Sequence, residues 1–244
     1  MRRREFILST AAAAGLGIRS LAAQTAEATK SERRWKGHGE SKVKRWDVIT
    51  VGNLSRNRYW GEPNDAAVRS VLCTTTLVAG DDFALLVDPS MKDAAAMARE
   101  LDRRTGKKPD YITACFVTHE HGDHWAGLEG FPKAKWFAAR GVAEVLNQTA
   151  KLSKQIEGVE GKLFESIDVV ATPGHTASHH ALRFDCDGRS IVTAGDAVAT
   201  QDFFRDRRGF YNSVDFEQAA RSMDKLASLA DIIVPGHDNY FLVD

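Results

Sequence analysis

The chain has 244 residues, 43% of them hydrophobic, and its 33 basic residues balance 33 acidic ones. A formal net charge of zero gives no strong positive field, so nucleic acid and anionic membrane surfaces are not expected as partners. The three cysteines cannot all pair with one another, and each falls in an apolar run, which predicts buried thiols rather than a disulfide framework.

The amino-terminal segment has the features of an export signal. Arg3-Arg4-Glu5-Phe6-Ile7 is a twin-arginine pattern, and an alanine-rich run with small residues at Ala22 and Ala23 follows it. We therefore predict a twin-arginine signal peptide and linker at residues 1–29, recognised by the twin-arginine export machinery, and a periplasmic catalytic domain at residues 30–244. The alternative, a disordered tail, does not explain the order of these features. No later run is apolar enough for a stable membrane span.

Alternating and β-branched runs predict strands at residues 43–51, 68–78 and 83–87. A helix should follow, opened by a capping box at Ser90 and Asp93 and ended near Gly106.

Further along the chain, a buried strand is expected at residues 111–117, a helical region at 141–155 and a polar linker at 157–162. Apolar residues at spacings of three and four then predict a helix with one core-facing stripe: Phe216, Ala219, Ala220, Met223, Ala227 and Ala230. By periodicity alone, the chain is an α/β protein with many short strands.

The strand at residues 111–117 leads directly into a cluster of metal-binding side chains, His119, His121, Asp123 and His124. Imidazole and carboxylate groups suit zinc, manganese or iron better than a metal that prefers thiolates. A sharp turn after a strand would direct the first two histidines to one point and the last two side chains to a neighbouring point. Two adjacent metal positions are therefore predicted, the alternatives being one structural zinc site or a solvated histidine loop.

Three later turns repeat this arrangement of a strand followed by a possible ligand. His175, Asp196 and His237 each come one to four residues after a short apolar run, and two of these turns contain Pro-Gly. Ligands on loops at one edge of a sheet are how rigid scaffolds build sites. His179 also follows His175 closely, but a supporting hydrogen bond is favoured over metal binding there.

These motifs, in this order and spacing, resemble those of the metallo-β-lactamase superfamily over roughly residues 43–244. The resemblance implies an αββα four-layer sandwich. It also implies two zinc ions per chain, the first held by His119, His121 and His175 and the second by Asp123, His124 and His237, with Asp196 bridging them. Asp123 and Asp196 would have catalytic roles.

Departures from individual subfamilies narrow the expected function. The β-lactamases lack the bridging aspartate found here at Asp196, and redox di-iron relatives usually have glutamate in place of His121. The segment from Asp196 to His237 is similar to the N-acyl-homoserine lactonases, although Ala199 replaces a tyrosine that commonly contacts their substrate. The length and the lead-in to Asp88 resemble metallo-β-lactamase domain-containing protein 1.

The resemblance thus predicts an exported dinuclear zinc hydrolase that cleaves a small ester, lactone or thioester by attack of metal-bound hydroxide. The alternatives are a mononuclear iron enzyme like the persulfide dioxygenases and a metallo-nuclease like domain-containing protein 1. A substrate wall is expected in the loop at residues 199–213, through Phe203, Phe204, Arg205 and Tyr211. The alternative is that these aromatic side chains only pack beneath the next helix. The turn-rich stretch at residues 53–65 either overhangs the site or caps a pair of strands.

Overall fold

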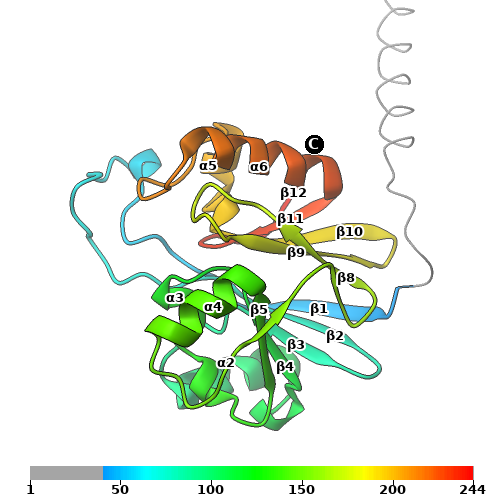
Figure 1. Cartoon of the computed structure of the whole chain (residues 1–244). Helices are drawn as coiled ribbons and strands as arrows, with labels where there is room; N and C mark the ends of the chain where they lie inside the picture. The colour runs from blue at the N-terminus through cyan, green and yellow to red at the C-terminus, as the bar shows by residue number, and fades with distance from the viewer. Residues whose placement is uncertain (1–40, 244) are drawn as a thin grey trace, which may run out of the picture. The chain divides into compact units, whose positions relative to one another are not determined.

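The computed structural model describes residues 41–243, so the predicted signal peptide lies outside the described residues. Its first six-stranded sheet is mixed: β1, β2 and β3 pair antiparallel, whereas β3, β4, β5 and β6 run parallel (Figure 1). In spatial order these strands are β1 (Val43–Thr50), β2 (Thr75–Gly80), β3 (Ala84–Val87), β4 (Ala114–Val117), β5 (Lys135–Ala139) and β6 (Glu157–Val159).

The second six-stranded sheet is also mixed. Its strands are β7 (Lys162–Leu163), β8 (Ile167–Ala171), β9 (His180–Cys186), β10 (Arg189–Gly195), β11 (Ile232–Pro235) and β12 (Phe241–Leu242). Because β8 and β10 are both antiparallel to β9, they run in the same direction, and β11 runs parallel to β10. The carboxyl ends of β8, β10 and β11 therefore meet at one edge of this sheet.

Helices lie beside the outer face of each sheet (Figure 1). Beside the first sheet are α2 (Ala94–Thr105), α3 (Gly122–Trp125) and α4 (Arg140–Thr149), and beside the second are α5 (Gln201–Arg205) and α6 (Phe216–Leu229). Short 3-10 helices occupy the connections: η1 (Arg58–Trp60), η2 (Pro109–Tyr111), η3 (Leu128–Gly130) and η4 (Asp196–Val198).

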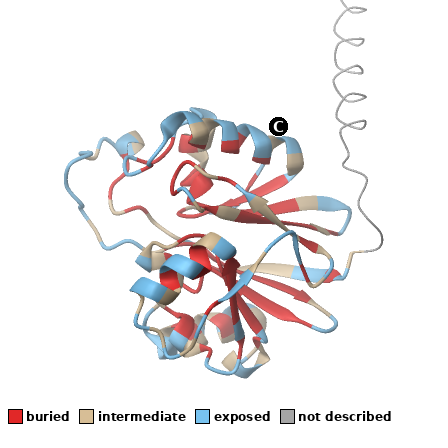
Figure 2. Ribbon diagram, in the orientation of Figure 1, coloured by how far each residue is buried: buried red, intermediate tan, exposed pale blue. Residues whose placement is uncertain are grey.

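Alternating side chains of the strands separate the hydrophobic core into layers. In β3, Leu85 and Val87 belong to the cluster between the sheets, whereas Leu86 faces the helices of the first sheet. In β10, Ile191 faces the first sheet and Val192 packs with α6. Buried residues accordingly occupy most of the central strands and the inner sides of the helices, whereas β1, β6 and β8 are only partly buried (Figure 2). The predicted αββα arrangement of four layers is confirmed.

Two predicted boundaries in the strands were wrong. The strand expected at residues 68–78 begins only at Thr75, because the preceding segment is a loop that touches Asn53 through an isolated bridge at Leu72. The expected linker at residues 157–162 instead contains β6 and begins β7. Both are outermost strands, one in each sheet, so this is where the chain crosses between sheets, and short polar strands suit such edges.

The N-cap predicted for α2, Ser90, was wrong. Asp93 is the N-cap, since its carboxylate accepts hydrogen bonds from the backbone N–H groups of Ala95 and Ala96. The Ser90 hydroxyl instead lies 3.1 Å from the Thr75 hydroxyl in a buried hydrogen bond. The predicted end was right, because Gly106 adopts the left-handed conformation with φ of 69°. The helix expected at residues 141–155 ends earlier, at Thr149.

The stripe predicted on α6 is correct at Ala219, Met223 and Ala230 and wrong at its start. Met223 is buried against the second sheet together with Leu226, Ala219 is also buried, and Ala230 packs partly buried against the same cluster. Phe216, in contrast, is 49% exposed. Phe216 is the first residue of the helix and lies beyond the sheet. All three cysteines are buried and unpaired, as predicted. Within residues 41–243, no helix has the length and apolar character that a membrane crossing requires.

Candidate metal centre

The loop after β4 carries four of the predicted ligands in a tight turn. His119 comes two residues after the strand, His121 precedes α3, and the first turn of α3 presents Asp123 and His124. His119 and His124 are fully buried, whereas His121 and Asp123 are half-buried. The turn therefore divides its side chains between two neighbouring points, as predicted.

The first group of donor atoms combines this loop with the turns after β8 and β10. His121 Nδ1 lies 3.1 Å from His119 Nε2 and 2.9 Å from His175 Nε2, and His175 Nε2 lies 3.3 Å from Asp196 Oδ2. A tetrahedral zinc site has ligands about 2.0–2.1 Å from the ion, which places neighbouring ligands about 3.3 Å apart. The four atoms fit one such ion.

The second group lies beside the first. His237 Nε2 is 3.5 Å from Asp123 Oδ2 and 3.0 Å from Asp196 Oδ1, and His124 Nε2 is 3.8 Å from Asp123 Oδ2. His124 Nε2 and Asp196 Oδ1 are buried 3.3 Å apart, yet neither has a hydrogen-bond partner. A cation between them would satisfy both atoms.

Asp196 connects the two groups, because one carboxylate oxygen faces each. Burial alone would raise the pKa of this carboxyl, but His237, His124 and His175 around it hold the pKa well below its ordinary value. The carboxylate is thus ionised and available to two cations. The structure brings together all seven residues predicted from the sequence.

Burial keeps several of the imidazoles neutral. It lowers the pKa of His119 well below 6.5 and that of His175 to about 4. Burial also favours the neutral form of His237, but Asp196 outweighs it and raises the pKa. A metal that binds His237 must therefore displace a proton from it, since only a neutral imidazole can bind a metal.

Asp88, which the sequence interpretation did not assign to the site, supports the second group. Its carboxylate lies 2.9 Å from His124 Nδ1 and accepts hydrogen bonds of 2.8 Å from both the backbone N–H and the hydroxyl of Thr118. A carboxylate on the distal nitrogen orients a ligand histidine and strengthens it as a base. Asp88 directly follows β3, the parallel neighbour of β4, so the pairing of these strands brings it to the histidine loop.

His179 has the supporting role predicted for it. Its Nδ1 lies 2.8 Å from the Thr172 hydroxyl, and its Nε2 accepts a hydrogen bond of 3.2 Å from the backbone N–H of Ala197. Burial lowers its pKa well below 6.5, which matches the acceptor role of Nε2. Because both ring nitrogens are engaged, His179 fixes the turn around Asp196 and has no nitrogen left for a metal.

The four predicted substrate-wall residues separate into two pairs. Phe203 and Tyr211 line a cavity of about 170 Å³ next to Phe210. Phe204 instead packs against Phe241 with 5.0 Å between ring centroids, and Arg205 is exposed on α5, 3.8 Å from Asp202. Substrate contact therefore remains a prediction for Phe203 and Tyr211, whereas Phe204 and Arg205 do not line this cavity.

The stretch at residues 53–65 packs against this wall rather than capping a pair of strands. The Tyr59 ring meets Phe203 edge to face at 5.0 Å, and its hydroxyl donates a hydrogen bond of 2.6 Å to Asp206. At its start, the carbonyl oxygen of Asn53 lies 3.2 Å from Nδ1 of His237. The stretch thus extends from the second metal group to the substrate wall.

Comparisons with known proteins agree with this geometry. Residues 69–237 match the family described as the metallo-beta-lactamase superfamily. Metallo-beta-lactamase domain-containing protein 1 of Xenopus laevis is 30% identical over 183 residues, which cover 70% of this chain and 72% of that protein.

A second relative and a solved structure share parts of the chain and its fold. Hydroxyacylglutathione hydrolase of Rhodopseudomonas palustris is 32% identical over 140 residues, covering 53% of this chain and 51%, about half, of that enzyme. A quorum-quenching N-acyl homoserine lactone lactonase superimposes with a TM-score of 0.63 at 21% identity, covering 83% of this chain and all of that one. The chain belongs to the metallo-β-lactamase superfamily and has its fold.

Proposed function

We propose that this protein is an exported, dinuclear zinc hydrolase that cleaves an ester, lactone or thioester. The observation that carries the proposal is the division of seven His and Asp donors into two adjacent groups joined by Asp196. The similar proteins support the proposal, since they include an N-acyl homoserine lactone lactonase and a hydroxyacylglutathione hydrolase.

Zinc is the metal that this donor set favours. Five imidazoles and two carboxylates are borderline-to-hard ligands, and the donor separations in the first group match tetrahedral zinc. Two bound zinc ions would polarise a substrate carbonyl and lower the pKa of water to about 7. Iron and manganese also bind imidazole and carboxylate ligands. Elemental analysis of the purified protein therefore identifies the metal.

The half-buried ligands indicate where the substrate would approach. His121 belongs to the first group and Asp123, whose side chain is 19% exposed, belongs to the second. All other members of the two groups are buried. A substrate entering over His121 and Asp123 would therefore meet both metal positions at once.

Asp196 is placed to move a proton during hydrolysis. Its carboxylate contacts His124, His175 and His237 and is kept ionised by them. We propose that it accepts the proton released when water attacks the carbonyl and passes it to the departing alkoxide or thiolate. The buried rings of Phe203 and Phe210 would restrict access of bulk water on the neighbouring side.

Homoserine lactones are expected to be poor substrates. At the position where related lactonases commonly have a substrate-contacting tyrosine, this chain has Ala199, which is buried among Leu54, Phe203 and Phe210. Ala199 supplies no phenol group to orient the lactone carbonyl, and the hydroxyl of nearby Tyr59 is hydrogen-bonded to Asp206. A thioester or an unrelated ester therefore fits the proposal better than an N-acyl homoserine lactone.

The experiment that tests the proposal measures kcat/KM of the zinc-loaded protein on a panel of lactones, aryl esters and thioesters. Asp123→Ala should lower kcat/KM by about 100-fold or more, because it removes a ligand of the second metal. Asp110→Ala is the matched control, since Asp110 is exposed and pairs only with Lys133. Undiminished turnover by Asp123→Ala would refute the two-metal mechanism, and no turnover by the unchanged protein would refute the hydrolase.

Export is supported by the sequence of the amino terminus alone. Changing both Arg3 and Arg4 to lysine should retain the protein in the cytoplasm of a bacterial host, whereas the unchanged chain should be found in the periplasm. Cell fractionation followed by immunoblotting distinguishes these outcomes. Equal export of the two chains would contradict the twin-arginine assignment.

A further inference from the structure

Arg56 is a buried arginine for which the described residues provide no counter-ion. Arg56 is 8% exposed, and its Nε is buried without a hydrogen-bond partner. Among residues 41–243, no carboxylate forms an ion pair with it. Burying a guanidinium whose hydrogen bonds are not made destabilises the fold, so a functional role would explain why Arg56 is placed here.

The interaction that Arg56 does make leaves its hydrogen-bonding edge available. Its Cζ lies 3.7 Å from the ring centroid of Tyr211, a cation–π contact between the face of the guanidinium and the ring. The N–H donors of arginine lie in the guanidinium plane, and stacking does not use them. Tyr211 thus fixes the position of Arg56 without neutralising it.

Both members of this pair are anchored to the proposed metal centre. Asn53, three residues before Arg56, accepts a hydrogen bond from His237 through its carbonyl oxygen. Val214, three residues after Tyr211, donates its backbone N–H to the carbonyl oxygen of His175 at 3.2 Å. Three residues span at most about 11 Å, so the Arg56–Tyr211 pair lies within that backbone reach of both ligand turns.

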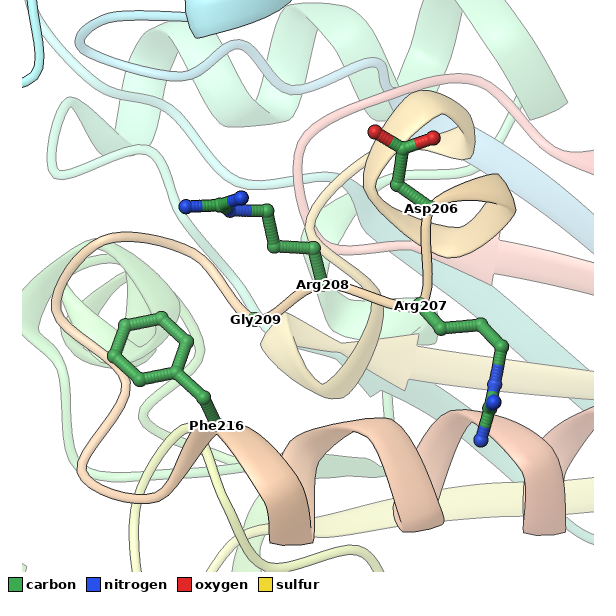
Figure 3. Close-up of a pocket in the computed structure, with 5 residues that line it drawn as sticks. All are labelled: Asp206, Arg207, Arg208, Gly209 and Phe216. Atoms are coloured by element: carbon green, nitrogen blue, oxygen red, sulfur yellow. The ribbon is translucent and has the colours of Figure 1, made fainter.

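The adjacent cavity is also rich in unpaired positive charge. Arg58 and Arg208 line it together with Tyr211, and neither forms an ion pair with another residue in the described part of the chain. Arg207 differs, because it pairs with Asp224 on α6. In the neighbouring pocket, Arg207 and Arg208 point in opposite directions (Figure 3).

This local excess of charge is unusual for the chain as a whole, in which 33 basic residues balance 33 acidic ones. Asp206, which lines the neighbouring pocket, already accepts a hydrogen bond from Tyr59. Three guanidinium groups therefore lie near aromatic rings with a shortage of anions. That combination is the recognition chemistry of a carboxylate attached to an organic group.

We infer that Arg56 is a specificity-determining residue that binds a free carboxylate of the substrate, so the preferred substrates are anionic esters or thioesters. Tyr211, which lines the cavity, holds the guanidinium in place, and Arg208 in the cavity lining adds to the attraction. The inference rests on the proposed hydrolase activity, to which it adds the charge of the substrate.

The test compares substrates that differ only in this charge. Glutaric acid monothiophenyl ester carries the carboxylate on its acyl side, and S-acetyl mercaptopropionate carries it on its leaving group. The methyl ester of each provides the neutral counterpart. The zinc-loaded protein should cleave at least one acid with a kcat/KM about 10- to 100-fold above that of its methyl ester, mainly through a lower KM.

Arg56→Gln should abolish this preference by lowering kcat/KM on the acids to the value measured on their methyl esters. Arg56→Lys should recover only part of it, because an ammonium group cannot bind a carboxylate in the bidentate manner. Arg103→Gln is the matched control, since Arg103 is exposed on α2 and pairs with Glu100. It should leave the preference unchanged.

The result remains decisive if Arg56→Gln does not fold. Arg208 is exposed, and Arg208→Gln should fold and reduce the same preference to a smaller extent. Equal kcat/KM on acids and methyl esters by the unchanged protein would overturn the inference and leave the hydrolase intact. A preference that survives in Arg56→Gln would also overturn it. No turnover of any of the four thioesters would overturn the inference, and the panel of lactones and aryl esters would then show whether hydrolase activity is present.

Discussion

At the scale of single residues, the site depends on side chains that align the ligands as much as on the ligands themselves. Asp196 joins the two donor groups, and Asp88 fixes the orientation of His124 from behind. Thr118 links Asp88 to the histidine loop through two hydrogen bonds. Each ligand is thus placed before a metal binds, which is the condition for tight binding and rapid chemistry.

Asp88→Asn tests this support. Asp88 has a backbone φ of 50°, a conformation that asparagine also tolerates, so the change removes the charge without straining the backbone. We expect the affinity for the second metal to fall by about 10- to 100-fold, because a carboxylate no longer polarises His124. Zinc titration monitored by calorimetry measures this affinity.

Asp110→Asn provides the control for the same chemical change at an exposed position. It should bind zinc as the unchanged protein does. If Asp88→Asn also bound both zinc ions with unchanged affinity, Asp88 would be part of the fold without a role in the metal centre.

Gly236 matters because its missing side chain makes room for Asp196. A Cβ at this position would collide with Oδ1 of Asp196 and with the backbone of Gly195. Gly236→Ala should therefore displace the bridging carboxylate and lower both zinc content and kcat/KM, by about tenfold or more in the latter.

Gly122→Ala is the contrasting change in the histidine loop. A Cβ there meets no other atom within 4 Å, and the position begins α3, so alanine should be tolerated. Comparable zinc loss in the two variants would show that crowding around Asp196 is not the cause.

At the scale of elements, the ligands follow strands that run in the same direction within each sheet. The sequence was sufficient to predict which side chains gather at this edge, because each polar turn comes directly after a short apolar run. Asp88 was missed since its role depends on β3 lying beside β4, a pairing between residues about 30 positions apart. Arg56 was missed for a similar reason, as only the fold brings it to Tyr211.

The start of α2 shows a local limit of the same kind. The sequence pattern predicted a capping box that begins at Ser90 and ends at Asp93, but Asp93 itself is the N-cap and the Ser90 hydroxyl is hydrogen-bonded to that of Thr75. Asp93→Ala should lower the free energy of unfolding by about 1 kcal/mol, because two backbone N–H groups of α2 lose their acceptor.

Urea denaturation measures that effect, and the zinc content should stay the same because α2 lies on the outer face of the first sheet. An unchanged unfolding midpoint would mean that the cap observed at Asp93 adds nothing to stability.

At the scale of the whole described region, four layers bring the ends of strands from both sheets to one place. The first sheet supplies the loop of His119 to His124, and the second supplies the turns of His175, Asp196 and His237. Neither sheet alone completes either donor group, since Asp196 takes part in both. The family resemblance predicted this layout, whereas periodicity alone predicted only an α/β protein with short strands.

The proposed function requires that this chain bind two metal ions through one bridging aspartate. Elemental analysis of the full chain, purified without added metal, measures this. We expect about two zinc ions per chain, as two tetrahedral donor groups imply, and about one in Asp123→Ala. A single iron per chain, as in the persulfide dioxygenases, or an Asp123→Ala variant that still binds two zinc ions, would contradict it.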